Sequence, residues 1–166
     1  MTILAWSLTS YTSEELIDLA VTIEKEGQEF YDQALLHAKG YKMKEALVFL
    51  AREEVKHIAV FQNIGEKLDK NFTPSESYEG EYEDYLKSIV NSRSFNVKKV
   101  KEMVEEIHTD KDILNFALTF EKDSILIFQE FKAFVNDAGK EIIQELIDQE
   151  KGHIRKIIEL FKDLED

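Results

Sequence analysis

Apolar residues recur every three or four positions over four long segments of the chain. Because a helix turns by about 100° per residue, this spacing places them on one helix face. The pattern predicts four helices, over residues 13–38, 41–70, 110–136 and 139–164. The segment between the second and third helices, 71–109, differs: it holds the chain's single proline, Pro74, and interleaves acids with tyrosines. We expect a crossover there, with short helices near 80–92 and 97–108.

The length of this crossover predicts how the helices are connected. A tight turn would make the third helix antiparallel to the second. A connection of this length lets the two run parallel, as in four-helix bundles with one long connection. The predicted fold is all-α, a four-helix bundle that the chain of 166 residues, 1–166, forms as a single domain.

Two Glu-x-x-His pairs interrupt the apolar faces of the second and fourth helices. They are Glu54 with His57, in LAREEVKHI, and Glu150 with His153, in IDQEKGHIRKI. Three residues along a helix bring two side chains to within roughly 60° of each other. A carboxylate and an imidazole that project together toward a core can both ligate one metal ion.

The two halves of the chain repeat each other around these positions. LAVTIEKEGQEFYDQA (19–34) aligns with FALTFEKDSILIFQEF (116–131), which matches Glu24 with Glu121. The two Glu-x-x-His pairs align as well, once a single gap is placed in the connecting turn. The sequence therefore predicts two helical hairpins, each carrying one core-facing Glu and then one Glu-x-x-His.

The repeat also separates these acids from their neighbours. Glu53 could pair with His57 one turn further along the helix, but its counterpart in the second half is Gln149. Glu26 and Glu29 are expected to face solvent. Only the residues of the hairpin pattern are matched by type at core-facing positions in both halves.

Buried carboxylates require partners of opposite charge. Each ionised carboxylate costs several kcal/mol to bury unless it is paired or ligated. Four carboxylates match the charge of two divalent ions, and carboxylate oxygens with imidazole nitrogens suit iron or manganese. We predict two iron ions, with manganese or a mixed pair as alternatives, and a metal-free network of buried salt bridges as the competing interpretation. The predicted metal ligands are Glu24, Glu54, His57, Glu121, Glu150 and His153.

The expected geometry divides these ligands between the two ions. Glu54 and Glu150 bridge them, so that Glu24 and His57 complete one ion. Glu121 and His153 complete the other.

Tyr31 follows Glu24 by seven residues, two turns along the same helix face. It could hydrogen-bond a ligand carboxylate or act in electron transfer, or it could be a core tyrosine with a satisfied hydroxyl. Its repeat counterpart is Phe128, so the symmetry of the two halves ends there. His37 and His108 lie at predicted helix ends, where surface or capping roles are expected.

Composition excludes several other classes of protein. The net charge of −13 argues against binding to nucleic acid or to an anionic membrane. The absence of cysteine rules out disulfides, thiolate metal sites and thiol nucleophiles. The apolar start lacks the basic region of a signal peptide, and no run approaches the ~18 apolar residues of a membrane span. We therefore expect a soluble, cytoplasmic protein.

Four segments together resemble a known superfamily. IEKEGQEFY, LAREEVKHI, FEKDSILIF and DQEKGHI are similar to the ligand-bearing helices of the ferritin-like di-iron carboxylate superfamily, and within it of the rubrerythrin-like proteins. The resemblance covers about residues 13–164. It implies a ferritin-like bundle, a dinuclear iron site, reaction with peroxide or dioxygen, and a homodimer.

The chain departs from rubrerythrins in two ways. Rubrerythrins carry a C-terminal rubredoxin domain with a four-cysteine iron site, whereas this sequence has no cysteine. Electrons are therefore expected from a separate donor protein or from ferrous iron. Rubrerythrins also carry an additional carboxylate three residues from the first ligand of the third helix. Leu118 and Ser124 occupy the two such positions around Glu121.

Three functions follow as hypotheses. The first is a di-iron oxidoreductase that reduces peroxide or dioxygen with electrons from an external donor. The second is a ferroxidase that handles iron, although a storage cage usually has a fifth helix for which the chain leaves no room. The third is a non-catalytic helical module.

Overall fold

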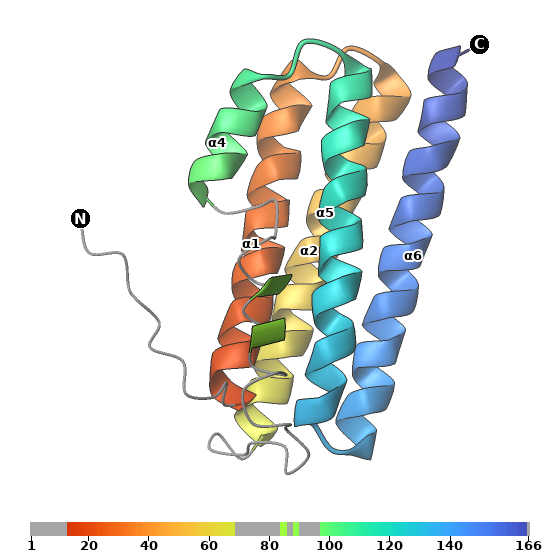
Figure 1. The fold of residues 1–166 in the computed structure, drawn as a ribbon. Coiled ribbons are helices and arrows are strands. Elements are labelled where there is room, and N and C mark those ends of the chain that lie inside the picture. Colours follow the sequence, from red (N-terminus) through yellow and green to blue (C-terminus); the bar gives the residue numbers. More distant parts are fainter. Residues whose placement is uncertain (1–12, 69–83, 86–87, 90–96, 166) are drawn as a thin grey trace.

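The computed structural model describes residues 13–68, 84–85, 88–89 and 97–165, and within them it contains helices and no strand (Figure 1). This confirms the predicted all-α class. The elements are α1 (Ser13–His37), α2 (Tyr41–Lys67), α4 (Val97–Glu105), α5 (Asp110–Phe131), the short 3-10 helix η1 (Lys132–Phe134) and α6 (Asp137–Glu165).

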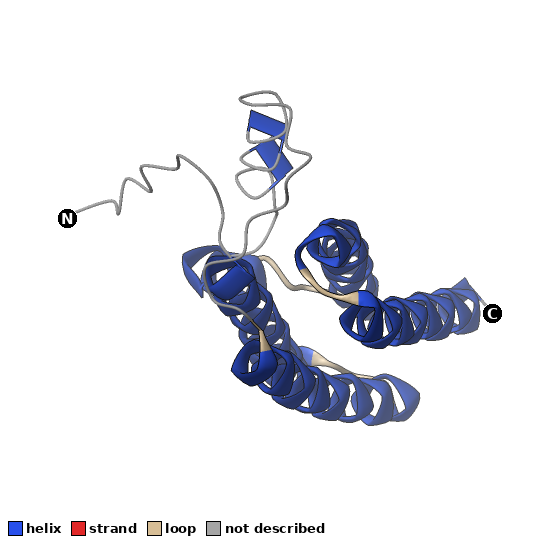
Figure 2. Ribbon diagram, turned by 90° about the horizontal axis from the view of Figure 1, so that it is seen from below, coloured by secondary structure: helices blue, strands red, loops and turns tan. Residues whose placement is uncertain are grey.

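The four long helices form two hairpins, α1–α2 and α5–α6, which pack against each other along their length. Figure 1 shows α2 and α5 running in the same direction, as the long crossover predicted. In the end-on view of Figure 2 the two hairpins face each other. By their residue numbers, the metal-ligand candidates come from all four long helices. The α4 helix packs against the outer side of α1.

Side-chain caps fix the start of α5 and join it to the α1–α2 turn. The Thr109 hydroxyl accepts a hydrogen bond from the Asp112 N–H at 3.2 Å, and the Asp112 carboxylate accepts one from the Thr109 N–H at 2.8 Å. Such caps contribute about 1 kcal/mol. At the first residue of α5, the Asp110 carboxylate accepts from the backbone N–H groups of Lys39 and Gly40, at 2.9 and 3.0 Å. These bonds hold the two hairpins at this end of the bundle.

Several helix ends differ from the sequence prediction. The third long helix ends at Phe131 and continues as η1, where residue 136 was expected as its end. The fourth begins at Asp137, two residues early, because the Asn136 side-chain oxygen accepts the Gly139 N–H at 2.9 Å and caps it. The predicted 97–108 helix ends at Glu105. The predicted short helix near 80–92 lies mostly outside the described residues, as do residues 69–70 of the second helix.

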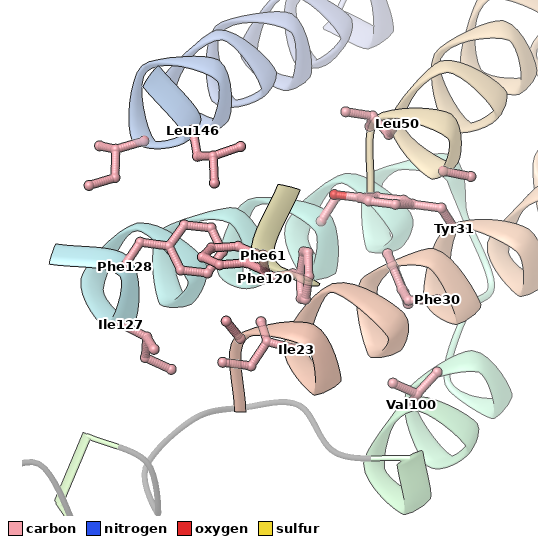
Figure 3. Close-up of a cluster of buried hydrophobic side chains, with 14 of the residues drawn as sticks. Ile23, Phe30, Tyr31, Leu50, Phe61, Val100, Phe120, Ile127, Phe128 and Leu146 are labelled. Atoms are coloured by element: carbon pink, nitrogen blue, oxygen red, sulfur yellow. The ribbon is translucent and has the colours of Figure 1, made fainter. Parts of the chain in front are cut away.

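Aromatic side chains fill the centre of the bundle toward both ends from the six predicted ligands. The Phe61 and Phe128 rings lie 4.8 Å apart between centroids, and Phe120 meets Tyr31 edge-on at 6.0 Å (Figure 3). All four side chains are almost fully buried. The aromatic stripe of the third long helix therefore serves packing, which leaves the polar cluster in an apolar surrounding.

One acidic residue contradicts the predicted exposure. Glu26, which we expected to face solvent, is 3% exposed, whereas Glu29 is exposed as predicted. The reason is α4: this helix lies over the face of α1 that a plain four-helix bundle would leave open. The two helices form a groove of about 520 Å³, which Glu26 lines together with Val100 and Val104.

Candidate metal centre

The six predicted ligands converge in the middle of the bundle, and all are buried. The four glutamates are 0% exposed, and the histidines 1% and 4%. Each long helix contributes ligand candidates from the face that packs into the core. These polar side chains therefore follow the same helical period as the apolar residues around them. The six residues are Glu24 from α1, Glu54 and His57 from α2, Glu121 from α5, and Glu150 and His153 from α6.

These side chains form two overlapping groups of four. In each group one potential ligand atom per residue lies within 4.8 Å of all the others. Glu54 and Glu150 belong to both groups, so their carboxylates lie between the two halves of the cluster. The first group adds Glu24 and His57, and the second adds Glu121 and His153.

Glu150 occupies the centre, with one oxygen toward each histidine. Its Oε1 lies 2.8 Å from Nδ1 of His57, and its Oε2 lies 2.7 Å from Nδ1 of His153. His57 Nδ1 is also 3.0 Å from Oε2 of Glu24, and His153 Nδ1 is 3.4 Å from Oε2 of Glu121. Both Nδ1 atoms therefore face the carboxylates. The two imidazole rings are stacked, 5.6 Å apart between centroids and 18° from parallel.

Most of the carboxylate oxygens in the cluster lack a hydrogen-bond donor. Six of them are buried without a hydrogen-bond partner; the two Glu150 oxygens among them contact the imidazoles as ion pairs, whereas both oxygens of Glu54 have no donor within hydrogen-bond distance. Buried polar atoms without partners are rare in native proteins because each costs free energy. Cations placed among these oxygens would satisfy them, so the residues fit a site for two divalent ions. Nearby on α5, Ser124 is fully buried and its hydroxyl also has no hydrogen-bond partner.

Burial and mutual repulsion oppose the ionisation of most of these acids. Burial raises the pKa of Glu24, and it raises the pKa of Glu54 and Glu121 well above the usual value, with further contributions from neighbouring carboxylates. Glu150 is the exception. Burial alone would raise its pKa, but the two adjacent imidazoles outweigh burial and lower it. Four ionised carboxylates therefore require added positive charge.

The same carboxylates raise the pKa values of the two histidines and so favour their protonated forms. Burial lowers the pKa of His57, but the carboxylates of Glu150, Glu24 and Glu54 outweigh burial and raise it. The pKa of His153 rises to about 10, since the carboxylates of Glu121 and Glu150 more than offset its burial. Without cations, the cluster holds protons on its imidazoles, and cations that bind there must displace them.

Tyr31 donates a hydrogen bond from its hydroxyl to Oε1 of Glu121. Of the interpretations left open by the sequence, this contact supports a hydrogen bond to a predicted ligand carboxylate. Burial raises the pKa of Tyr31 well above its usual value, so the hydroxyl stays protonated and keeps its role as donor. Its part in electron transfer stays a prediction. His37 and His108 are exposed and lie outside the cluster.

Three further residues surround the histidines, and the sequence did not single them out as part of a site. Gln149 Oε1 lies 3.0 Å from Nε2 of His57. An oxygen of Glu53 lies within 4.8 Å of a ring nitrogen of each histidine. The Phe49 ring meets the His153 ring edge-on, with 5.9 Å between centroids. Lys156 Nζ lies 4.5 Å above the centroid of the Phe49 ring. Glu53 and Gln149 share one signal, since each directly precedes the Glu of a Glu-x-x-His pair.

No helix among the described residues is both long enough and apolar enough to cross a membrane. No protein-family model matches the sequence, and no curated protein matches it either. Among solved structures, the chain is similar to a Thermotoga maritima protein provisionally described as a ferritin-like diiron-carboxylate protein. The two are 26% identical, with a TM-score of 0.66 over 90% of this chain and 94% of that one. The rubrerythrin-like subtype stays a prediction, while the four-helix architecture and this likeness give the chain a ferritin-like fold and support its place in the ferritin-like superfamily.

Proposed function

We propose that the protein is a di-iron oxidoreductase that reduces peroxide or dioxygen with electrons from an external donor protein. The observation that carries the proposal is the pair of overlapping four-residue groups that share Glu54 and Glu150. Two iron ions held there would supply redox chemistry, cycling between the ferrous and ferric states. The Thermotoga maritima neighbour is itself described as a diiron-carboxylate protein, which supports iron over other metals.

The carboxylates and imidazoles of the cluster are arranged to bind two positively charged iron ions. Glu24 and His57 would hold one ion from the α1–α2 hairpin, and Glu121 and His153 would hold the other from the α5–α6 hairpin. Glu150 is ionised and lies between the imidazoles, so it is ready to bridge. Oxygen and nitrogen donors without thiolate favour iron or manganese over soft metals.

Proton supply and solvent exclusion also come from the chain. Reduction of hydrogen peroxide to two water molecules consumes two electrons, from the donor protein, and two protons. The Tyr31 hydroxyl is a protonated group in direct contact with Glu121, so it can hold or pass a proton at that carboxylate. Buried rings on the same side, including Phe120, keep bulk water from the cluster.

The test is to load the protein with ferrous iron without oxygen and then add peroxide with an excess of an artificial electron donor. We expect two iron ions per chain and many turnovers. Glu54→Gln, which removes a shared carboxylate, should lose both. Glu66→Gln on the same helix is the matched control, since Glu66 is exposed. A protein that binds no iron would overturn the proposal, and one round of iron oxidation without turnover would favour a ferroxidase instead.

Native mass separates the proposal from iron storage. The resemblance to rubrerythrin-like proteins implies a homodimer, and we propose that state for this chain. A large closed shell in native mass spectrometry would instead support storage.

A further inference from the structure

The two halves of the cluster match in their six inner residues but differ in the next layer. The position just before the motif Glu is Glu53 in the first half and Gln149 in the second. Because α2 and α6 run antiparallel, each of these residues lies against the histidine of the other hairpin. Gln149 Oε1 lies 3.0 Å from Nε2 of His57, and an oxygen of Glu53 lies within 4.8 Å of a ring nitrogen of His153 as well as of His57. The two halves therefore differ in the group next to the outer side of each imidazole: a neutral amide for His57 and a carboxylate for His153.

The contact of Gln149 orients the ring of His57. Its Oε1 is an acceptor and lies 3.0 Å from Nε2, so that nitrogen carries the proton and donates it. Nδ1, at 3.0 and 2.8 Å from oxygens of Glu24 and Glu150, is then the nitrogen that would present a lone pair to a cation once the cation has displaced its proton. This is the arrangement that a metal-bound histidine requires.

Glu53 holds the sequence position on α2 that matches Gln149 on α6, and one of its oxygens lies within 4.8 Å of a ring nitrogen of His153. Its side chain is a carboxylate where Gln149 has a neutral amide. Nδ1 of His153 faces Glu150 at 2.7 Å, so Nε2, on the opposite side of the ring, is the nitrogen left for an outer partner. The Glu53 side chain is 14% exposed and also contacts Lys56, whose side chain is 68% exposed. The contact with Lys56 is made through one carboxylate oxygen, Oε1, so the other oxygen of Glu53 stays available as an acceptor. A carboxylate that accepts an imidazole N–H makes the opposite nitrogen a stronger donor to a metal.

We propose that Glu53 and Gln149 are positioning residues that make the two ion positions unequal, with the Glu121–His153 position binding a divalent cation more tightly than the Glu24–His57 position. The inference rests on the proposed two-ion site. Replacing a partner behind a metal-bound histidine typically changes metal affinity by about 10- to 100-fold. We expect a difference of about tenfold between the two positions.

Single-position variants give the test, with Co²⁺ as a probe that needs no catalytic turnover. His57→Ala leaves the Glu121–His153 position, and His153→Ala leaves the Glu24–His57 position. Titration followed by the visible spectrum of Co²⁺ should give a dissociation constant about tenfold lower for His57→Ala. Adding Glu53→Gln should remove that advantage, while adding Glu45→Gln, an exposed acid on the same helix, should not.

The cross-over pattern distinguishes positioning from a general effect on folding. Gln149→Glu should tighten binding in the His153→Ala background and leave the His57→Ala background unchanged. Equal affinities in the two single-position variants, or a Glu53→Gln effect of the same size in both, would overturn the inference. If wild-type protein binds no Co²⁺, Mn²⁺ or Fe²⁺ at all, the proposed function itself fails.

A second measurement covers the case in which a histidine variant does not fold. In Co²⁺-loaded protein the two imidazole N–H protons give separate, exchangeable, paramagnetically shifted NMR signals. Glu53→Gln should move one of them and Gln149→Glu the other. Two signals that both move with one substitution, or neither with either, would contradict the assignment.

Discussion

Replacing Glu54 by glutamine should make the metal-free protein more stable, although the residue is fully buried at the centre of the bundle. Neither oxygen of Glu54 has a hydrogen-bond partner, and burial with the neighbouring acids raises its pKa well above the usual value. Glutamine has nearly the same size, carries no charge, and can donate its amide N–H to the carboxylate of Glu24 or Glu150. An unsatisfied buried polar group costs about 1–3 kcal/mol.

The expected gain is therefore about 1–3 kcal/mol in the presence of EDTA. For a chain of this length, each kcal/mol shifts the melting temperature by about 2–4 °C. With excess Mn²⁺ the order should reverse. A ligand at one thousand times its dissociation constant stabilises the folded state by about 4.1 kcal/mol, which exceeds the gain expected for the variant. Wild-type protein gains this and Glu54→Gln, which has lost a shared ligand, does not.

Thermal melts followed by circular dichroism measure both quantities. Glu54→Gln should melt above wild type in EDTA and below it in Mn²⁺, while Glu66→Gln should track wild type in both. A variant that melts lower than wild type in EDTA would refute the reasoning, because Glu54 would then be serving the fold rather than a metal.

Three further outcomes follow from the same structure. The pKa of His153 is raised from 6.5 to about 10, so the metal-free folded state binds more protons than the unfolded state between these values; its free energy of unfolding, measured by urea titration in EDTA, should fall from pH 7 to pH 9. A Cβ on Gly27 would lie 2.1 Å from the ring of Phe120, so Gly27→Ala should cost about 1–3 kcal/mol in the same assay, whereas Gly152→Ala meets only the tip of a flexible arginine at 3.7 Å and should be neutral or stabilising. Tyr31→Phe leaves a buried oxygen of Glu121 without its donor and should lower stability by about 1–3 kcal/mol in EDTA.

The inner cluster could be predicted from the sequence because two local signals coincide there. Helical period alone places Glu24 and Glu121 on apolar faces, and the internal repeat shows that the same residue types recur at matched positions. Together they select six residues, which the structure brings together. Their binding of ions stays a prediction.

Features that depend on how separate helices meet could not be predicted in this way. Glu26 was expected at the surface because the helical period of α1 does not show that α4 covers that face. The antiparallel meeting of α2 and α6 brings Glu53 and Gln149 each to the histidine of the other hairpin, which the helical period of a single helix does not show. The end of α5 at Phe131 likewise depends on the tight turn into α6.

Anomalous diffraction from crystals grown with iron or manganese tests the central claim most directly. The account predicts two anomalous peaks per chain, both between the carboxylates of Glu54 and Glu150. One should be bounded by Glu24 and His57, and the other by Glu121 and His153. Crystals that diffract well, contain the metal in excess and show no peak inside the bundle would contradict it.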